Sequence, residues 1–330
     1  MIVNVCCSGS SGSTFFSQLL NRHPDIACGE ELSLFSKPIF YEDYNRLKRW
    51  NQLIRNFGIS SNPYFQDRAI LVNTDSYGLR KRDIWTRVME SSDVKAFVGG
   101  LEDHVLEITN KRIWAEKTPT NIYMLGPFLK VFPNSKVIHL VRDPRDIIIS
   151  FMARGHTVVS AGDFWLACMS AIRNYRQDAR VLEIRYEDLI LKSEEILEKV
   201  CRHLGIRFDM NYFLEDRYLS KGLKRSEGLK SWRIRPSAGF SAASIGRYKE
   251  SKVDLENIFT ITLSREFAAL FHVTPLSLAE IAENYGYSFG VSQQKKCEGR
   301  PCLRVDARGP LSRIADMVIE KYAPIISSIY

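Results

Sequence analysis

The chain has 330 residues, of which 45% are hydrophobic and 25% charged, a balance that excludes a disordered or fibrous protein. Its 46 Lys and Arg against 38 Asp and Glu give a formal net charge of +8. No apolar run approaches the roughly 20 residues of a membrane-spanning helix, and no signal peptide is visible, so we expect a cytoplasmic protein. Seven Cys without regular spacing fit a reducing compartment and argue against a disulfide framework or a zinc ribbon.

An apolar strand at residues 2–7 leads through a Ser/Gly loop at 8–13 into a helix at 14–21, which His23-Pro24 ends. Further strands are predicted at 113–115, 136–141 and 181–185. Helices are predicted at 121–132, at 144–154, from an Asp163 cap to 177, and near 193–204. This alternation favours an α/β fold with a parallel sheet covered by helices on both faces. Ligands bind at the carboxyl ends of the strands in such sheets.

Other segments surround this core. Residues 33–100 carry weaker, more polar helical patterns, which indicate an insertion that shapes a substrate cleft. Helical patterns return at 254–271, 277–285 and 311–322, with a loop at 286–310. Residues 221–252 include nine basic and two acidic residues, so this segment has a net charge of +7. It is either a functional loop for a polyanion or a solvated connection. No nucleic-acid-binding motif accompanies it, so we expect no nucleic-acid partner.

The first motif is the loop after the first strand, which reads Ser-Gly-Ser-Ser-Gly-Ser-Thr at residues 8–14. A strand that enters a helix through such a loop presents backbone N–H groups and hydroxyls to a phosphate. A nucleotide triphosphatase would carry Lys where this chain has Ser13. The motif therefore predicts a P-loop-like phosphate loop that is not an ATPase loop. The alternative is a tight strand-to-helix turn without a ligand.

The second motif follows the buried strand at 136–141. Arg142 stands at the carboxyl end of that strand, and Pro144 begins the next helix. Ser150 and Arg154 are four residues apart and therefore share a helix face. These three side chains are predicted to converge on one anion. The alternative is a surface arginine cluster paired with neighbouring aspartates.

Two shorter motifs contribute reactive groups. Lys117 leaves a predicted strand just before a Pro-bearing turn and points to the same sheet edge. Glu30 and Glu31 follow the phosphate-loop helix, where a general base would be close to a reacting centre. In isolation, Lys117 would be interpreted as a solvated lysine and the glutamates as helix-capping charges.

In this order, the segments SGSSGSTFFSQLLNRHPDIACGEE, EKTPTN, FPNSKVIHLVRDPRDIIIS and RYEDL resemble the sulfotransferases that use 3′-phosphoadenosine 5′-phosphosulfate. The Gly-Glu-Glu is similar to that of the tyrosylprotein-sulfotransferase and bacterial branch. The resemblance covers residues 2–35 and 112–205, with a weaker match near 244–249. It implies a single domain over 1–330 with a nucleotide-binding core at 1–35 and 112–250. The insertion at 36–111 and the helical tail at 270–330 would then shape the acceptor site.

The resemblance also implies roles for individual residues. Glu31, or else Glu30, would be the catalytic base, and Lys117 would stabilise the leaving phosphate. The loop would hold the 5′-phosphosulfate, and other residues would hold the 3′-phosphate or lie over the nucleotide. The implied donor-binding residues are Ser10, Ser11, Gly12, Ser13, Thr14, Arg142, Ser150, Arg154, Tyr186, Ser244, Arg247 and Lys249.

One position departs from the family pattern, because family members usually carry Lys or Arg where this chain has Ser10. We expect Lys117 or the basic segment to replace that cation. The implied reaction is sulfuryl transfer to a hydroxyl or amine of a small-molecule, glycan or peptide acceptor, with adenosine 3′,5′-bisphosphate as product and no metal. The alternatives are an inactive nucleotide-binding scaffold and a nucleotide kinase of similar fold. The phosphate loop lacks the lysine of a nucleotide triphosphatase, which argues against the kinase. The oligomeric state is not readable from the sequence.

Overall fold

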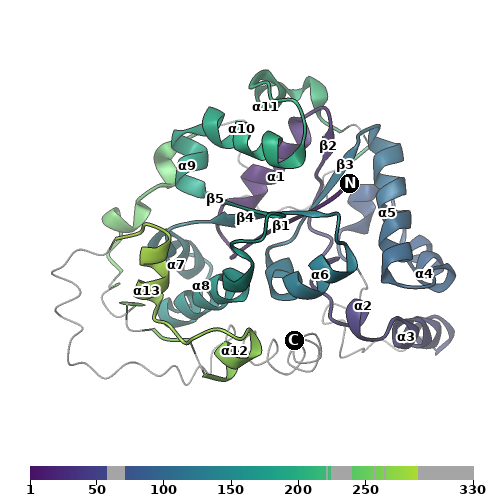
Figure 1. Cartoon of the computed structure of the whole chain (residues 1–330), viewed down its shortest axis with the longest axis horizontal. Coiled ribbons are helices and arrows are strands. Elements are labelled where there is room, and N and C mark those ends of the chain that lie inside the picture. The colour runs from purple at the N-terminus through teal and green to yellow at the C-terminus, as the bar shows by residue number, and fades with distance from the viewer. Residues whose placement is uncertain are drawn as a thin grey trace.

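The computed structural model describes residues 1–57, 71–220, 222–223, 240–253, 255, 258–259, 261–263 and 265–288. Most of the basic segment and the predicted helix at 311–322 lie outside these residues. The five strands of the described part form one parallel sheet in the order β2-β3-β1-β4-β5 (Figure 1). The strands are β1 (Ile2–Cys7), β2 (Ile26–Ala27), β3 (Ile113–Lys117), β4 (Lys136–Val141) and β5 (Val181–Arg185).

Helices cover both faces of the sheet (Figure 1). One face carries α1 (Ser13–Arg22), α9 (Tyr186–Leu191), α10 (Ser193–Leu204) and α11 (Asn211–Leu214). The other carries α6 (Leu125–Val131), α7 (Pro144–Met152), α8 (Val158–Ile172), α12 (Arg265–Leu270) and α13 (Leu278–Asn284). The insertion contains α2 (Ile39–Glu42), α3 (Tyr44–Phe57), α4 (Lys81–Glu90) and α5 (Val94–Thr109). The predicted α/β fold with a parallel sheet between two helical layers and a helical insertion is confirmed.

The alternation of side chains along β1 explains the two layers. Val3 and Val5 pack with Phe16 of α1 in one apolar cluster, whereas Cys6 packs with the α7–α8 side in the other. Every residue of β1 is buried, which fits its central place in the sheet. The chain therefore buries two apolar layers against a single central strand.

Three predicted helices differ from those in the structure. The helix expected to start at Asp163 is α8, which starts five residues earlier because the Thr157 side chain accepts the Ser160 N–H as its cap. The expected helix at 121–132 is a 3₁₀ helix, Pro119–Met124, followed by α6. Among the described residues of the expected helix at 254–271, those of Arg265–Leu270 form α12, whereas Thr262 pairs with Ser277 in an antiparallel bridge instead.

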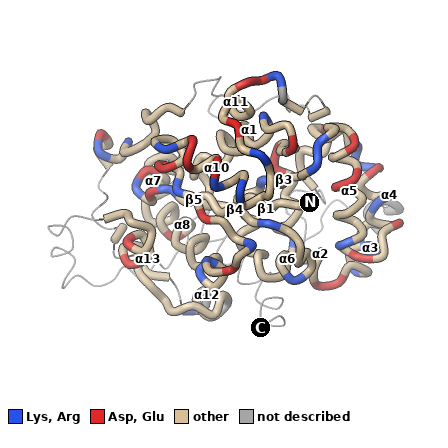
Figure 2. The backbone as a smooth tube through the Cα atoms, turned by 45° about the horizontal axis from the view of Figure 1, so that its top comes forward, with Lys and Arg blue, Asp and Glu red and all other residues tan. Residues whose placement is uncertain are grey.

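The charged residues of the helical insertion are of both signs on two of its helices and of one sign on another. Lys and Arg are interspersed with Asp and Glu along α4 and α5 (Figure 2), whereas the charged residues of α3 are all basic. None of the helices in the described ranges is long and apolar enough to cross a lipid bilayer.

The end of α1 is joined to β2 by one buried ammonium group. Lys111 Nζ donates to the backbone carbonyls of Asn21 (2.6 Å), His23 (3.0 Å) and Ile26 (2.9 Å). Burial lowers the pKa of Lys111 to about 8, so the group still carries its proton at pH 7. The carbonyls of Asn21 and His23 lie at the end of α1, where a helix leaves carbonyls without an intrahelical partner, and the carbonyl of Ile26 belongs to β2. Lys111 thus joins the end of the helix that follows the phosphate loop to β2.

We predict that Lys111→Met lowers the free energy of unfolding by about 1–3 kcal/mol, since it leaves buried carbonyls without a donor. Urea denaturation at pH 7 measures this difference. Lys95→Met is the matched control, because Lys95 is exposed on α5 and its replacement should stay within about 0.5 kcal/mol of wild type. Equal effects of the two substitutions would contradict the role given to Lys111.

Candidate active site

The register of the parallel sheet brings the sequence motifs to one edge. Val5 of β1 is paired with Lys117 of β3, and Cys7 of β1 is paired with Leu140 of β4. The carboxyl end of β1 therefore lies between the end of β3 and the end of β4. Arg142 follows β4, and Tyr186 follows β5 in the same direction. This edge is the ligand-binding edge of an open α/β sheet.

The phosphate loop is shaped by two residues with positive φ. Gly12 has φ 86° at the cap position of α1, and Ser10 has φ 66°. An ideal Cβ at Gly12 would lie 2.4 Å from ring carbons of Tyr186, so the ring occupies the space of any side chain there. Ser8 and Ser11 share a hydrogen bond between hydroxyls at 2.8 Å. The loop backbone is thereby fixed against the residue that follows β5.

Arg142 is the buried cation at the centre of this edge. Its Nη1 donates to the Ser10 carbonyl at 2.9 Å, and its Nη2 donates to the Ser244 carbonyl. Nη2 also lies 3.6 Å from an Asp146 carboxylate oxygen, and the guanidinium carbon lies 4.7 Å from the centroid of the Tyr186 ring. Its Nε is buried and donates to no acceptor within the described residues. A buried N–H with no protein partner fits an anionic ligand such as a phosphate.

Ser150 and Arg154, which the helical spacing placed on one face, both reach Ser10. Ser150 Oγ donates to Ser10 Oγ at 3.2 Å, and Arg154 Nη2 donates to the same hydroxyl. Arg154 also donates through Nε to the Ser150 carbonyl at 3.1 Å, and its guanidinium carbon lies 4.2 Å from the centroid of the Phe151 ring. The structure thus brings Arg142, Ser150 and Arg154 together on one residue of the loop.

The described end of the basic segment is held against α7. The buried carboxylate of Asp146 accepts the Gly246 N–H (2.8 Å) and the Tyr248 N–H (3.1 Å). Ser244 is buried, whereas Arg247 and Lys249 are exposed. The family resemblance implied that all three lie over the nucleotide, and the structure locates the backbone that carries them beside Arg142. Asp146, which sequence reasoning treated only as a partner for surface arginines, is the residue that anchors this backbone.

On the other side of the loop, Lys117 and Glu31 form an ion pair. Lys117 Nζ donates to Glu31 Oε1 at 2.6 Å, and the side chain of Lys117 is 4% exposed while that of Glu31 is 29% exposed. Glu30 points elsewhere, because its Oε2 accepts from Ser76 Oγ at 3.0 Å. Neither glutamate lies in a helix, so the capping interpretation is wrong for both. A half-exposed carboxylate beside a buried ammonium can take a proton from one ligand and stabilise negative charge on another.

A buried carboxylate beneath this pair was missed by sequence reasoning. Glu116 accepts the Leu32 N–H at 3.0 Å, the Thr118 hydroxyl at 2.7 Å and an amide N–H of Asn121. Burial raises the pKa of Glu116, and these hydrogen bonds oppose that shift. Thr118 in turn accepts the Ser33 N–H at 3.0 Å. The backbone on the carboxyl side of Glu31 is thus held by residues at the end of β3.

A second missed carboxylate joins the turns after β4 and β5. Glu187 Oε1 accepts the Asp143 N–H at 3.0 Å, and its Oε2 accepts the Tyr287 hydroxyl at 2.8 Å. Burial raises the pKa of Glu187, and these bonds work against that shift. The only sequence signal was the position of Glu187 directly after Tyr186. Its contact with Asp143 fixes the turn that begins with Arg142.

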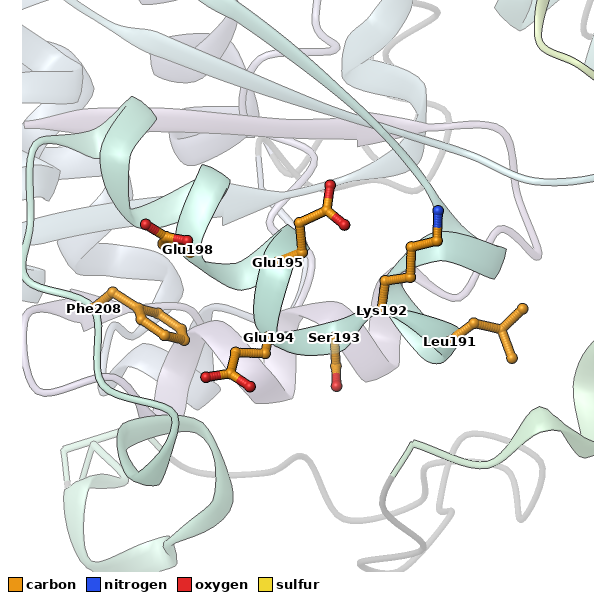
Figure 3. Close-up of a pocket in the computed structure, with 7 residues that line it drawn as sticks. All are labelled: Leu191, Lys192, Ser193, Glu194, Glu195, Glu198 and Phe208. Carbon is orange, nitrogen blue, oxygen red and sulfur yellow. The ribbon is translucent and has the colours of Figure 1, made fainter.

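A cavity of about 690 Å³ lies elsewhere on the molecule, at the start of α10. Figure 3 shows Glu194, Glu195 and Glu198 of α10 together with Lys192 and Phe208. None of the predicted site residues lines it. Across the described part of the chain, no three His, Cys, Asp or Glu side chains gather as metal ligands.

A sequence model described as "Sulfotransferase family" matches residues 3–210. A protein-tyrosine sulfotransferase from Drosophila melanogaster is 21% identical over 227 residues, which cover 64% of this chain and 39% of that protein. An omega-hydroxy-beta-dihydromenaquinone-9 sulfotransferase from Mycobacterium bovis is 31% identical over 108 residues, covering 27% of this chain and 28% of that protein. The chain therefore matches only about half or less of the length of these curated relatives.

Solved structures show the same fold. The sulfotransferase domain of the Synechococcus PCC 7002 olefin synthase has a TM-score of 0.60 at 19% identity, covering 88% of this chain and 95% of that one. A sulfotransferase domain from the curacin biosynthetic pathway has a TM-score of 0.55 at 19% identity, covering 88% of this chain and 98% of that one. With a family match that spans more than half of the sequence, and with the phosphate loop, Lys117 and Arg142 at one sheet edge, this chain belongs to the sulfotransferase family.

Proposed function

We propose that the chain transfers a sulfuryl group from 3′-phosphoadenosine 5′-phosphosulfate to a hydroxyl or amine of an acceptor. The observation that carries the proposal is the placement of two groups on either side of one loop. The Lys117–Glu31 pair lies on one side, and Arg142 with Ser150 lies on the other. The donor carries a reactive 5′-phosphosulfate and a separate 3′-phosphate. It therefore needs one of these groups of side chains at its 5′ end and the other at its 3′-phosphate.

In this proposal the loop N–H groups and the hydroxyls of Ser11, Ser13 and Thr14 hold the 5′-phosphosulfate. Arg142, with its unused Nε, and Ser150 hold the 3′-phosphate. The Tyr186 ring, which packs against Gly12 and Arg142, lies beside the nucleotide. The backbone around Ser244 that Asp146 holds would close over the donor with Arg247 and Lys249.

The reaction then proceeds as one in-line displacement at sulfur. The acceptor oxygen or nitrogen forms a bond to sulfur while its proton passes to the Glu31 carboxylate. The bond from sulfur to the bridging oxygen breaks, and adenosine 3′,5′-bisphosphate leaves with that oxygen. Lys117 and the loop N–H groups stabilise the negative charge that grows on the oxygen. These groups supply the charge stabilisation without a metal ion, and positioning provides much of the rate, as in phosphoryl transfer.

The acceptor is a small molecule, a glycan or a peptide. The named relatives act on protein tyrosine and on a hydroxylated menaquinone, which supports a hydroxyl acceptor. We propose that the insertion at 36–111 and the tail at 270–330 shape the acceptor site. The contacts of Asn73, Ser76 and Tyr77 with Glu30 and Glu31 support this for the insertion.

Replacing Arg142 by Ala should weaken binding of adenosine 3′,5′-bisphosphate by about 1.5–3 kcal/mol, because a charge-assisted phosphate contact is lost. Adenosine 5′-monophosphate, which lacks the 3′-phosphate, should lose much less. Calorimetric titration of both nucleotides measures the difference. Arg145→Ala is the control, since Arg145 pairs with Asp143 and stacks on Tyr248. An equal loss for the two nucleotides would refute the assignment of Arg142 to the 3′-phosphate.

Glu31→Gln should lower turnover by about 10²–10⁴-fold, the usual contribution of a general base, and leave donor affinity nearly unchanged. A donor-turnover assay across a panel of hydroxyl and amine acceptors measures this and also tests the proposed function. Glu30→Gln is the matched control, because Glu30 bonds Ser76 instead of Lys117. If Glu30→Gln is inactive and Glu31→Gln is active, the base is Glu30. If the wild-type chain binds the donor but transfers sulfuryl groups to none of the acceptors in the panel, the chain is a nucleotide-binding scaffold.

Glu116→Gln tests whether the hydrogen bonds of Glu116 hold the proposed base, Glu31, in position. The substituted amide would turn an N–H₂ group toward donors that now bond a carboxylate, and so release the backbone after Glu31. We expect kcat to fall by about tenfold or more, as a small displacement of a catalytic group does, with the affinity for the bisphosphate unchanged. Glu102→Gln on α5 is the control. A loss of nucleotide affinity as large as the loss of kcat would show general damage to the site instead.

A further inference from the structure

The peptide group between Arg142 and Asp143 is held at both of its polar ends. The Arg142 carbonyl accepts the indole N–H of Trp165 at 3.2 Å. The Asp143 N–H donates to Glu187 Oε1 at 3.0 Å. Both partners, Trp165 and Glu187, are buried. Because a peptide group is planar, these two bonds fix its orientation, and with it the backbone from which the Arg142 side chain extends.

One short segment after α13 contacts both partners of this peptide group. Tyr285 and Tyr287 stand on either side of Gly286, which has φ 75°, the left-handed conformation that commonly ends a helix. The Tyr285 ring packs edge-on against Trp165, with 6.4 Å between the ring centroids. The Tyr287 hydroxyl donates to Glu187 Oε2 at 2.8 Å. Since α13 packs on α8, which carries Trp165, the segment starts from a fixed place in the helical layer (Figure 1).

The two tyrosines are themselves held in place. The guanidinium carbon of Arg176 lies 4.3 Å from the centroid of the Tyr285 ring, and that of Arg185 lies 4.5 Å from the centroid of the Tyr287 ring. Both tyrosines are buried. Burial and the neighbouring Glu187 carboxylate raise the pKa of Tyr287, so its hydroxyl keeps its proton and acts as the donor in the bond to Glu187.

Arg142 depends on Glu187 through two routes. The first is the Asp143 N–H, which Glu187 accepts. The second is Tyr186, which directly precedes Glu187 and whose ring centroid lies 4.7 Å from the Arg142 guanidinium carbon. Without the Tyr287 hydroxyl, Glu187 Oε2 would lose its donor in a buried setting. A carboxylate that moves to regain a donor would carry both routes with it.

We propose that Tyr287 is a positioning residue for the 3′-phosphate site, because its bond to Glu187 sets the turn from which Arg142 binds that phosphate. The inference rests on the proposed function, in which Arg142 holds the 3′-phosphate. Tyr287 lies beyond residues 3–210, which the family model matches. The inference therefore gives a part of the tail a role in donor binding, whereas the proposed function gave the tail a role only at the acceptor.

Tyr287→Phe in the full chain removes the hydroxyl and keeps the ring. We expect the affinity for adenosine 3′,5′-bisphosphate to fall by about three- to thirtyfold, the range over which residues outside a site change binding through their contacts. The affinity for adenosine 5′-monophosphate, which lacks the 3′-phosphate, should stay near that of wild type. Calorimetric titration of both nucleotides measures the two affinities. Partial unfolding would lower both by the same factor, so their ratio reports the 3′-phosphate site and not stability.

Tyr123→Phe is the matched control. Tyr123 is also buried, and its hydroxyl is hydrogen-bonded to Cys168 instead of Glu187. Its replacement removes the same chemical group from the core, and should leave both nucleotide affinities unchanged.

A double substitution tests whether the effect passes through Arg142. In an Arg142→Ala background, Tyr287→Phe should not weaken bisphosphate binding further, because the side chain that it positions is gone. Additive losses in the double variant overturn the inference. Glu187→Asp is the second variant, since it keeps the charge and draws the carboxylate back by one methylene. It should give the same selective loss, and it keeps the inference testable if Tyr287→Phe does not fold.

The outcomes separate this inference from the proposed function. If wild type prefers the bisphosphate and Tyr287→Phe weakens both nucleotides equally, Tyr287 has only a structural role and the inference alone fails. If Tyr287→Phe folds and changes neither affinity, the inference again fails alone. A wild-type chain that binds neither nucleotide, or that binds both equally, overturns the proposed function and this inference with it.

Discussion

The position of β1 between β3 and β4 is the constraint on which the site depends. Parallel pairing fixes the residue pairs Val5–Lys117 and Cys7–Leu140, so the three strands end at one edge in a fixed register. A slip of one residue in either pairing would turn the buried side chains of that strand to the opposite layer. The burial of every residue of β1 makes such a slip costly. The separation between the Lys117 side and the Arg142 side of the loop is therefore set by the core.

Buried carboxylates hold the loops at this edge of the sheet in place. Glu116, Asp146 and Glu187 each accept at least one backbone N–H from a different segment: the chain after Glu31, the residues after Ser244, and the turn after β4. A buried carboxylate needs several donors to offset the loss of water, so each fixes its loop tightly. None of the three is assigned a contact with the proposed donor. Their contribution is to hold the residues that are.

The sequence allowed the main strands to be predicted, because buried parallel strands read as short apolar runs and turn signals border them. The 136–141 and 181–185 strands are predicted with the bounds that the structure has. The two-residue strand β2 has no pattern to detect. The family was recognisable because four motifs stand in order, and the match over residues 3–210 confirms it.

The supporting contacts were not predictable for a different reason. Asp146 bonds N–H groups about one hundred residues further along the chain, and Glu116 bonds the N–H of Leu32, 84 residues before it. No local periodicity encodes such pairs. Likewise, the spacing of Ser150 and Arg154 indicated a shared helix face, but only the tertiary structure shows that both reach Ser10. The roles assigned to the individual site residues stay predictions.

The contacts between the insertion and the two glutamates limit how this chain can diversify. Asn73 donates to the Glu31 carbonyl at 2.8 Å, and the Tyr77 hydroxyl donates to the Glu30 carbonyl at 2.8 Å. The insertion therefore holds the backbone of both glutamates. Under the proposed function, in which Glu31 is the base and the insertion shapes the acceptor site, selectivity and catalysis are not separate modules. A segment grafted from a relative to recruit a new acceptor would then have to reproduce these two bonds, or it would shift the proposed base along with the proposed pocket.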